Sequence, residues 1–449
     1  MKNSKYKKIL IISLILNFTF LILNLNYVSA LEAKRTVLPN GLIVLHSENH
    51  NLPLVMVTLL IKASQINEPE DKAGLANLTA ELLTEGTEKR KSADISEEIE
   101  FIGASLDASA DRDYTVVALS ILKKDVNKGF EILSDILLNS IFPEEEIKRK
   151  KELIKGFLKQ KEEDPSFLAG REFKKALFGR HPYARLIEGC LDTIDNIKRE
   201  DLVGFYSDYF LPNNSILSVA GDLTFEELDT LIKKYLGDWK MAEISKRSKE
   251  WVPNESRTKK VIKIDKDLTQ ANIILGNVGI SRDNPDYYAV SVMNYIFGGG
   301  GFSSRLMRSI RDEMGLAYDV HSFFTANKET GFFAVEVQTK NESAKLVISE
   351  ILKQVERIRK EHVSDEELSD AKSYLTGSFA RRLDTNRKIA DFLASVEFYN
   401  IGIDYMERYP EYINFLTKDD ILRVALKYLD SENYVIVVVA NQEKATLKY

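Results

Sequence analysis

An internal duplication constrains the fold of this 449-residue chain more than any other feature of its sequence. The stretch ALSILKKDVNKGFEILSDIL at 118–137 aligns with AVEVQTKNESAKLVISEIL at 334–352, an offset of roughly 215 residues that is far longer than a solenoid repeat. Around each copy the pattern predicts two strands, two helices, a strand pair, a helix, three or four further helices and a last strand. We therefore predict an α+β fold of two duplicated domains, each a largely antiparallel sheet with helices packed on one face.

The N-terminal residues 1–30 are typical of a signal peptide. Lysines precede the apolar run 9–23, and the small residues Val28, Ser29 and Ala30 follow it, as in a cleaved export signal. The alternative is an uncleaved membrane anchor, for which the run is short and is interrupted by Asn17. We expect cleavage and export to the periplasm, and contact with a membrane only if the segment stays attached.

The domain boundaries follow from composition. Residues 241–257 are polar and charged and are predicted to be a linker. We therefore expect an N-terminal domain at 31–240 and a C-terminal domain at 258–449. The first two strands of the N-terminal domain, at 34–47 and 54–63, are predicted to pair as a hairpin.

The charge balance and cysteine content exclude some classes of protein. The chain carries 62 basic and 68 acidic residues, a net charge of -6, and this balance argues against a nucleic acid partner. Cys190 is the only cysteine, so no internal disulfide can form. We expect its thiol to be buried and inert.

A glycine-rich stretch at 298–320, GGGGFSSRLMRSIRDEMGLAYDV, is the first candidate site. Its four glycines predict a mobile turn before a helix at 303–314 that Gly315 ends, and a strand follows. Arg311 would then lie in the last helical turn and Tyr318 on the strand. A guanidinium and a phenol pointing into one cleft suit the binding of a peptide backbone. The alternative is a solvated charged helix face with Tyr318 half-buried in a sheet, but four consecutive glycines are unfavourable for a mere connector.

A second motif lies at 74–87, GLANLTAELLTEGT. It resembles the G-x-x-H-x-x-E-H-x-x-x-x-G-T helix of the pitrilysin, insulinase and mitochondrial processing peptidase family of zinc peptidases. The family's first zinc-binding histidine falls on Asn77, its catalytic glutamate on Ala80 and its second histidine on Glu81. The third zinc ligand, about 76 residues further on, falls on Phe157.

These four substitutions remove the chemistry of the motif. A zinc hydrolase needs about three His, Asp or Glu ligands, an open coordination position and a general base. Asn77 is a poor zinc ligand, Ala80 cannot accept a proton and Phe157 cannot bind metal. Glu81 alone cannot form a zinc site. We expect no catalytic residue and no metal site in this chain.

The resemblance extends over essentially the whole mature length. His181-Pro182 with Gly189 and the pair Gly221-Asp222 after an apolar strand occur in the family's order and spacing. The family's C-terminal half carries an Arg and a Tyr, seven residues apart, that contact substrate after a glycine-rich loop and SSRL; Arg311 and Tyr318 match them.

What the resemblance implies is a non-catalytic subunit. The family includes heteromers in which one subunit bears the zinc motif and another bears the Arg and Tyr, and two clam-shell halves enclose a chamber. The chain would then be the substrate-binding subunit of an exported hetero-oligomeric zinc peptidase that acts on unfolded peptides. Its partner would be a catalytic homologue, which would hold the zinc.

Two alternatives belong to other classes. The chain could be a structural scaffold that handles no peptide. It could also be an active hydrolase with a relocated site formed by Cys190 and His181, although Cys190 has no evident helix N-terminus or cationic neighbour to activate it. His46 and His50 are four residues apart in a strand end and loop, and we expect both at the surface.

Overall fold

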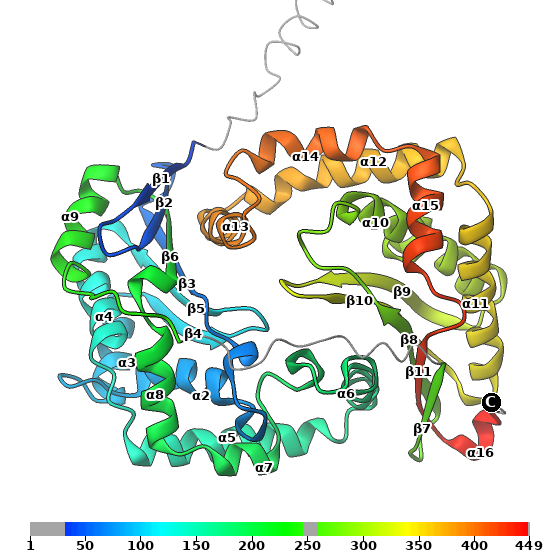
Figure 1. Cartoon of the computed structure of the whole chain (residues 1–449), viewed down its shortest axis with the longest axis horizontal. Helices are drawn as coiled ribbons and strands as arrows, with labels where there is room; N and C mark the ends of the chain where they lie inside the picture. Colours follow the sequence, from blue (N-terminus) through cyan, green and yellow to red (C-terminus); the bar gives the residue numbers. More distant parts are fainter. Residues whose placement is uncertain (1–31, 246–258, 448–449) are drawn as a thin grey trace, which may run out of the picture.

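Two halves, each built on one sheet, face each other in the computed structural model (Figure 1). The structure describes residues 32–245 and 259–447. The predicted signal peptide and most of the predicted linker lie outside the described residues. Within the described ranges, no helix is long and apolar enough to cross a bilayer.

The strands form two sheets within the described residues. The N-terminal sheet has the order β1-β2-β6-β3-β5-β4 and the C-terminal sheet the order β7-β11-β8-β10-β9. The strand bounds are β1 (Lys34–Val37), β2 (Ile43–Glu48), β3 (Leu54–Ile61), β4 (Ser105–Ala110), β5 (Thr115–Leu122), β6 (Ser215–Gly221), β7 (Lys260–Asp265), β8 (Gln270–Val278), β9 (Ala317–Ala326), β10 (Gly331–Lys340) and β11 (Val435–Ala440).

The α-helices follow a similar order in the two halves, except that a π-helix over Met307–Glu313 takes the place of the second helix in the C-terminal half. They are α2 (Leu75–Leu82), α3 (Ser92–Phe101), α4 (Val126–Leu138), α5 (Glu144–Lys161), α6 (Pro165–Phe178), α7 (Leu191–Asn196), α8 (Arg199–Tyr209), α9 (Phe225–Tyr235), α10 (Tyr287–Asn294), α11 (Ala344–Lys360), α12 (Asp365–Phe379), α13 (Asn386–Phe398), α14 (Tyr405–Asn414), α15 (Lys418–Tyr428) and α16 (Gln442–Ala445). The boundary between α5 and α6 is encoded locally, because Asp164 accepts hydrogen bonds from the backbone N–H groups of Ser166 and Phe167 and Pro165 cannot continue the preceding helix.

The duplication is confirmed strand by strand. The order β2-β6-β3-β5-β4 repeats as β7-β11-β8-β10-β9, and the aligned copies at 118–137 and 334–352 form β5 with α4 and β10 with α11. In each half one strand pair is parallel, β2 with β6 and β11 with β7. The other pairs are antiparallel. The predicted α+β class with largely antiparallel sheets is therefore correct.

The predicted hairpin between the first long strands is wrong. β6 lies between β2 and β3 and pairs with both, in the registers Ile43↔Ile216 and Leu59↔Leu217. Every residue of β6 is buried. β6 takes a central position, where it is covered on both sides, and this long-range pairing overrides the sequence proximity of β2 and β3.

The two halves exchange a helix. The third helix after each strand pair, α6 in the N-terminal half and α13 in the C-terminal half, packs on the sheet of the opposite half (Figure 1). Phe173 of α6 contacts the cluster around Phe332 and Val437, and Leu393 of α13 packs with Leu60. Each sheet thus has its own helices on one face and an exchanged helix on the other.

Polar contacts reinforce the junction between the halves. Arg35 donates to both carboxylate oxygens of Glu397, each at 2.8 Å. Asp113, in the turn between β4 and β5, accepts from the backbone N–H of Lys328 at 2.8 Å and from the hydroxyl of Tyr399 at 3.1 Å. Both contacts join residues far apart in the sequence, so the relative position of the halves is specified by hydrogen bonds as well as by apolar packing.

Candidate functional site

An ion-pair network occupies the positions of the zinc motif on α2. The side-chain amide of Asn77 donates to Glu81 Oε1 at 2.9 Å. Glu81 Oε2 lies 3.4 Å from Lys150 Nζ on α5, and the same ammonium lies 3.1 Å from Glu85 Oε1. Ala80 is fully buried. Side chains of opposite charge therefore link α2 to α5.

Phe157 contributes nothing that could bind a metal ion. It lies on α5 with 41% of its surface exposed, and the Lys161 ammonium is 5.8 Å from its ring centroid. Across the described residues, no group of three His, Cys, Asp or Glu side chains is placed to hold a metal. The four residues at the family's zinc and catalytic positions do not fit a zinc ion.

The parts of the motif that are retained have structural roles. Gly74 has a φ of 99°, and a Cβ there would lie 2.6 Å from the Glu188 carbonyl oxygen. A Cβ on Gly86 would lie 2.8 Å from Pro143 Cγ. Thr87 donates to Asp135 Oδ2 of α4 at 2.7 Å. Gly74, Gly86 and Thr87 therefore hold α2 in place, and this structural role does not depend on the zinc and catalytic residues of the motif.

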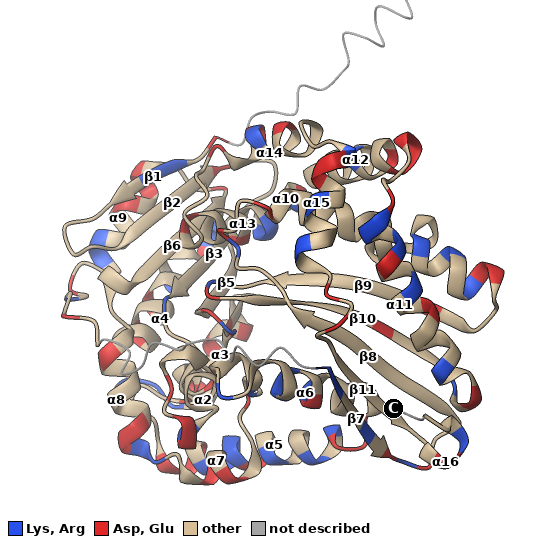
Figure 2. Ribbon diagram, turned by 45° about the vertical axis from the view of Figure 1, so that its right-hand side comes forward, with Lys and Arg blue, Asp and Glu red and all other residues tan. Residues whose placement is uncertain are grey.

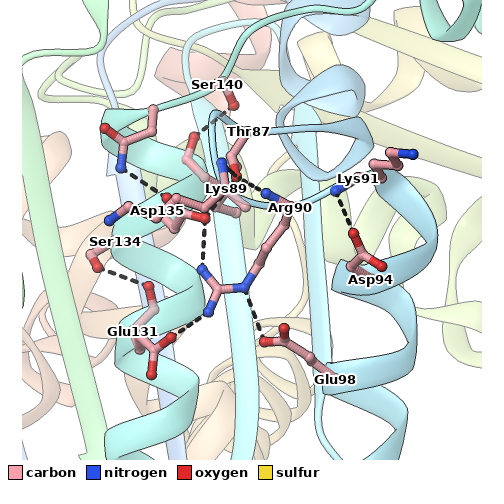
Figure 3. Close-up of polar contacts among 12 residues, drawn as sticks. Thr87, Lys89, Arg90, Lys91, Asp94, Glu98, Glu131, Ser134, Asp135 and Ser140 are labelled. Carbon is pink, nitrogen blue, oxygen red and sulfur yellow. Dashed lines mark hydrogen bonds and ion pairs between the residues drawn. The ribbon is translucent and has the colours of Figure 1, made fainter.

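Arg90 adds a set of ion pairs next to Thr87 (Figure 3). Its guanidinium lies 3.0 Å from Glu98 Oε2 and 2.7 Å from Asp135 Oδ2, and it also contacts Glu131. Burial acts against the charge of Arg90, but the three carboxylates outweigh it and raise the pKa of its guanidinium. The segment after α2 is thus tied to α3 and α4.

The glycine-rich stretch differs from the predicted mobile turn. Helix α10 continues as a π-helix over Tyr295–Gly299, and a 3-10 turn over Gly301–Ser303 follows. A Cβ on Gly298 would lie 2.5 Å from Ser322 Oγ of β9. Gly298 is therefore needed for close packing of a helix end against a strand, whereas Gly301 has open space around it and is favoured by its φ of 58°.

Arg311 and Tyr318 come together, as the spacing predicts. Arg311 lies on a π-helix over Met307–Glu313, a helix type frequent at functional sites. Its guanidinium carbon is 5.5 Å from the ring centroid of Tyr318 and 4.6 Å from that of Phe302. Phe302 and Tyr318 are 69% and 87% exposed. Two exposed rings thus flank one guanidinium, within the range of cation–π attraction.

A β-bulge turns Tyr318 outward. The register of β9 and β10 runs from Val337↔Val320 to Thr339↔Ala317, so two residues of β9, Tyr318 and Asp319, face one residue of β10. Such a bulge re-aims a side chain at the sheet edge. The alternative of a half-buried Tyr318 is therefore wrong, and Phe302 is a neighbour that sequence reasoning missed, although it directly follows the glycine run.

A pocket of about 480 Å³ lies beside Tyr318. Its lining combines β8, β9 and β10 with the exchanged helix α6, and it includes Ile274, His321, Glu336 and Ala169. Burial raises the pKa of Glu336, against the opposing influence of His321 and Lys174. Because β9 is an edge strand of its sheet, the pocket lies next to a strand with one unpaired backbone edge.

The predictions for the histidines at the end of β2 are half right. His46 is buried, and its Nε2 lies 2.7 Å from the Leu223 carbonyl oxygen, so the surface assignment of His46 is wrong. The ring of Phe225, at the start of α9, lies 6.1 Å from the His46 ring, centroid to centroid. His50 is exposed and its ring nitrogens contact Asp222 and Glu48, as expected of a surface residue.

Cys190 differs from its prediction in two ways. Its side chain is exposed, and it occupies the N-cap of the short helix α7, which the sequence did not reveal. His181, the proposed partner, is fully buried; its Nε2 lies 2.8 Å from Glu329 Oε2 and its Nδ1 accepts from the Tyr183 N–H. The ring of His181 is thus engaged in the junction between the halves.

Family models match the chain in two parts. The model described as "Insulinase (Peptidase family M16)" matches residues 43–189, and the one described as "Peptidase M16 inactive domain" matches residues 196–375. The chain belongs to the insulinase, or M16, peptidase family, and the predicted resemblance is confirmed.

Relatives and solved structures agree with this assignment. An uncharacterized zinc protease of Rickettsia felis is 27% identical over 88% of this chain and 94% of its own length. A non-peptidase homolog of Helicobacter pylori is 25% identical over 89% and 92%, and a probable mitochondrial-processing peptidase subunit beta of Arabidopsis thaliana is 27% identical over 92% and 79%. The structure of a peptidase M16 inactive domain from Pseudomonas fluorescens superimposes with a TM-score of 0.85, at 27% identity over 91% of this chain and 98% of the other.

Proposed function

We propose that the chain is a non-catalytic, substrate-binding subunit of an exported hetero-oligomeric zinc peptidase that acts on unfolded peptides. In this proposal a homologue with the intact zinc motif supplies the metal and the general base. The relative described as a peptidase subunit supports assembly from several subunits, and the relative described as a non-peptidase homolog supports a member without peptidase activity.

The observation that carries the proposal is the exposed cluster of Phe302, Arg311 and Tyr318 at the edge of a pocket. A guanidinium donates to peptide carbonyl oxygens, a phenol donates or accepts, and the ring faces cover apolar side chains. Arg311 has one carboxylate neighbour, Asp312 at 3.6 Å within the described residues, and this long contact leaves donors of its guanidinium for a ligand. Two aromatic rings preorganise a side chain that would otherwise be mobile.

The edge strands provide a backbone template. β4 and β9 are each one of the two outer strands of a sheet, and an extended peptide can add to such an edge by main-chain hydrogen bonds. Only an unfolded segment can present its backbone in this way. This requirement favours short or unfolded substrates over folded proteins.

The experiment that tests the proposal replaces Arg311 with Ala in the complex with a zinc-bearing homologue. The loss of hydrogen bonds from a charged donor corresponds to a fall in kcat/KM of about ten- to a hundredfold. The size of the complex, measured by size-exclusion chromatography, should not change. Arg308→Ala is the matched control, because Arg308 is exposed on the same helix. Unchanged turnover in the Arg311→Ala complex would favour a scaffold role instead.

A second variant tests the neighbour that the structure adds. Phe302→Ala removes one of the two rings beside Arg311, and we expect kcat/KM to fall about twofold to fivefold, the range of a single exposed cation–π contact. The double variant Phe302→Ala/Arg311→Ala should lose little more than Arg311→Ala alone, since the ring acts through the guanidinium. Additive losses would show that Phe302 acts independently of Arg311.

A further inference from the structure

We propose that Arg305 and Ser309 are positioning residues that fix the direction of Arg311. They do so through two carboxylates, Glu367 on α12 and Glu350 on α11. This inference rests on the proposed function, because it concerns the side chain that would hold the peptide. Arg305 and Ser309 are themselves buried, so they would act on Arg311 without touching the peptide.

Arg305 joins the start of the helical segment that carries Arg311 to α12. Its Nε donates to Glu367 Oε1 at 2.6 Å, and its Nη2 donates to Glu367 Oε2 at 2.8 Å. The same carboxylate accepts from the backbone N–H of Ser364 at 2.8 Å, which fixes it at the N-terminus of α12. A planar bidentate contact restricts direction as well as distance. Arg305 therefore ties its segment to one place on α12.

Ser309 supplies the second anchor, two residues before Arg311. Its hydroxyl donates to Glu350 Oε1 at 2.6 Å. Charged residues of both signs lie along α11 (Figure 2), yet Glu350 is 7% exposed. A buried carboxylate is unfavourable unless it accepts hydrogen bonds, and Glu350 accepts them from Ser309 and Gln354. Because the side chain of Ser309 is short, this contact directly constrains the backbone next to Arg311.

Hydrogen bonds keep both carboxylates in the charged form. Burial acts to raise the pKa of Glu367, but the hydrogen bonds from Arg305 and Ser364 outweigh it, and the pKa is lowered. Burial also acts to raise the pKa of Glu350, but hydrogen bonds led by that of Ser309 lower it. Hydrogen bonds to ionised groups are shorter and stronger than those between neutral groups, so both carboxylates hold their donors firmly.

The direction of Arg311 depends on these anchors because its segment is a π-helix. The N–H of Met314 donates to the carbonyl oxygen of Ser309, five residues earlier, at 3.1 Å. Successive residues of an α-helix lie about 100° apart around its axis, so a change of this turn to the α-helical pattern would rotate one side of it against the other by an angle of that order. Arg311 would then turn away from Phe302 and Tyr318, whose ring centroids lie 4.6 and 5.5 Å from its guanidinium carbon.

The pair of Arg305 and Glu367 is a weak source of stability. Arg305 is 8% exposed, and its Nη1 is buried without a hydrogen-bond partner among the described residues, so its guanidinium loses hydration that its contacts replace only in part. Replacing a buried ion pair by uncharged residues of similar volume is often neutral or stabilising. What this pair adds is a defined direction, which a binding site requires of the elements that support it.

The test measures binding of a labelled unfolded peptide to the purified chain by fluorescence anisotropy. The double variant Arg305→Met/Glu367→Gln removes both charges and keeps an oxygen that can accept from Ser364. Ser309→Ala removes the second anchor. We expect each change to weaken binding about tenfold, as for the loss of one well-directed hydrogen bond from a charged donor. Arg308→Met is the matched control, because Arg308 is exposed on the same segment, and it should bind like the parent chain.

Combination with Arg311→Ala separates positioning from a general effect on the fold. If Arg305 and Ser309 act through Arg311, their variants should bind no more weakly in the Arg311→Ala background than Arg311→Ala alone. A further loss of about tenfold in that background would overturn the positioning role. Unfolding in urea checks that each variant is folded, and Ser309→Ala, which removes a single hydroxyl group, keeps the test decisive if the double variant does not fold.

The outcomes also distinguish this role from the proposed function. If Arg311→Ala weakened binding while the variants of Arg305 and Ser309 bound like the parent chain, the positioning role would be overturned and the substrate-binding function would stand. If the parent chain bound no peptide, the substrate-binding function would fail and the positioning role with it. A loss that occurs only where Arg311 is present is the result that supports both.

Discussion

Replacement of Lys150 by Met is the most informative perturbation of the degenerate zinc helix. Its ammonium bridges Glu81 and Glu85, and the side chains of Lys150 and Glu85 are 17% and 11% exposed. An exposed ion pair contributes up to about 1 kcal/mol, whereas breaking a buried pair costs about 3–5 kcal/mol. Because this bridge is partly buried, and because Glu85 keeps Arg149 and Ser92 as partners, we expect a local loss of about 1–3 kcal/mol.

Amide hydrogen exchange in α2 and α5 is the appropriate assay, because it reports local opening. A loss of 1–3 kcal/mol corresponds to exchange that is about 5- to 150-fold faster. Lys148→Met is the matched control, since Lys148 is exposed on the same helix, and it should leave the exchange of α2 unchanged. If the amides of α2 exchanged as slowly in Lys150→Met as in the parent chain, the ion pairs of Lys150 could not be what holds α2 against α5.

The effect should also depend on pH, with a sign set by Glu85. Burial acts to raise the pKa of Glu85, but hydrogen bonds from Ser92, Lys150 and Arg149 outweigh it, and the pKa in the folded protein is lowered. A carboxyl with a lowered folded pKa contributes its full stabilisation above its ordinary pKa and loses it as the pH falls through the folded value. The difference between Lys150→Met and the parent chain should therefore shrink in acid.

Two further substitutions test the contributions of Glu68 and Arg35 to stability. Glu68 accepts hydrogen bonds from the backbone N–H groups of Gly74 and Ala76, and burial raises its pKa from 4.5 to about 7. Because the folded protein then resists ionisation of this carboxyl, the contribution of Glu68 to stability should become unfavourable as the pH rises from about 4.5 to 7. Glu68→Gln does not titrate, and it replaces one of the two accepting oxygens with an amide nitrogen that cannot accept. The stability of the parent chain relative to Glu68→Gln, measured in urea, should therefore fall by up to about 3 kcal/mol between pH 4.5 and 7, and a constant difference over this range would contradict this. Arg35→Ala removes the bidentate contact with Glu397, but Arg35 is 40% exposed, so the melting temperature should reflect a loss of less than about 1 kcal/mol; a larger loss would mean that this contact holds the halves together.

Local patterns were sufficient to predict the duplication and the approach of Arg311 to Tyr318. Apolar periodicity and turn residues act over a few residues, and the spacing from a helix end to the following strand places the two side chains on one side. The loss of the zinc motif follows from the resemblance to the family, which identifies the positions, together with the chemistry of the residues found there. In any conformation, the side chains of Asn77, Ala80 and Phe157 do not supply the zinc ligands and the general base that the motif requires.

The features that were missed depend on partners distant in sequence. The insertion of β6 between β2 and β3 and the exchange of α6 and α13 are set by the packing of the whole molecule, which no window of sequence contains. The same holds for the pairing of Lys150 with Glu81 and Glu85. The β-bulge that exposes Tyr318 arises from the register of β10, so its outward direction could not be derived from β9 alone.

The central claim is tested most directly by cleavage of an internally quenched unfolded peptide. The assay compares an exported homologue with the intact zinc motif, this chain, and a mixture of the two. The account predicts that this chain is silent alone and that the mixture cleaves the peptide far faster than the homologue alone. A mixture no faster than the homologue would contradict the account and return Arg311 and Tyr318 to the status of ordinary surface residues.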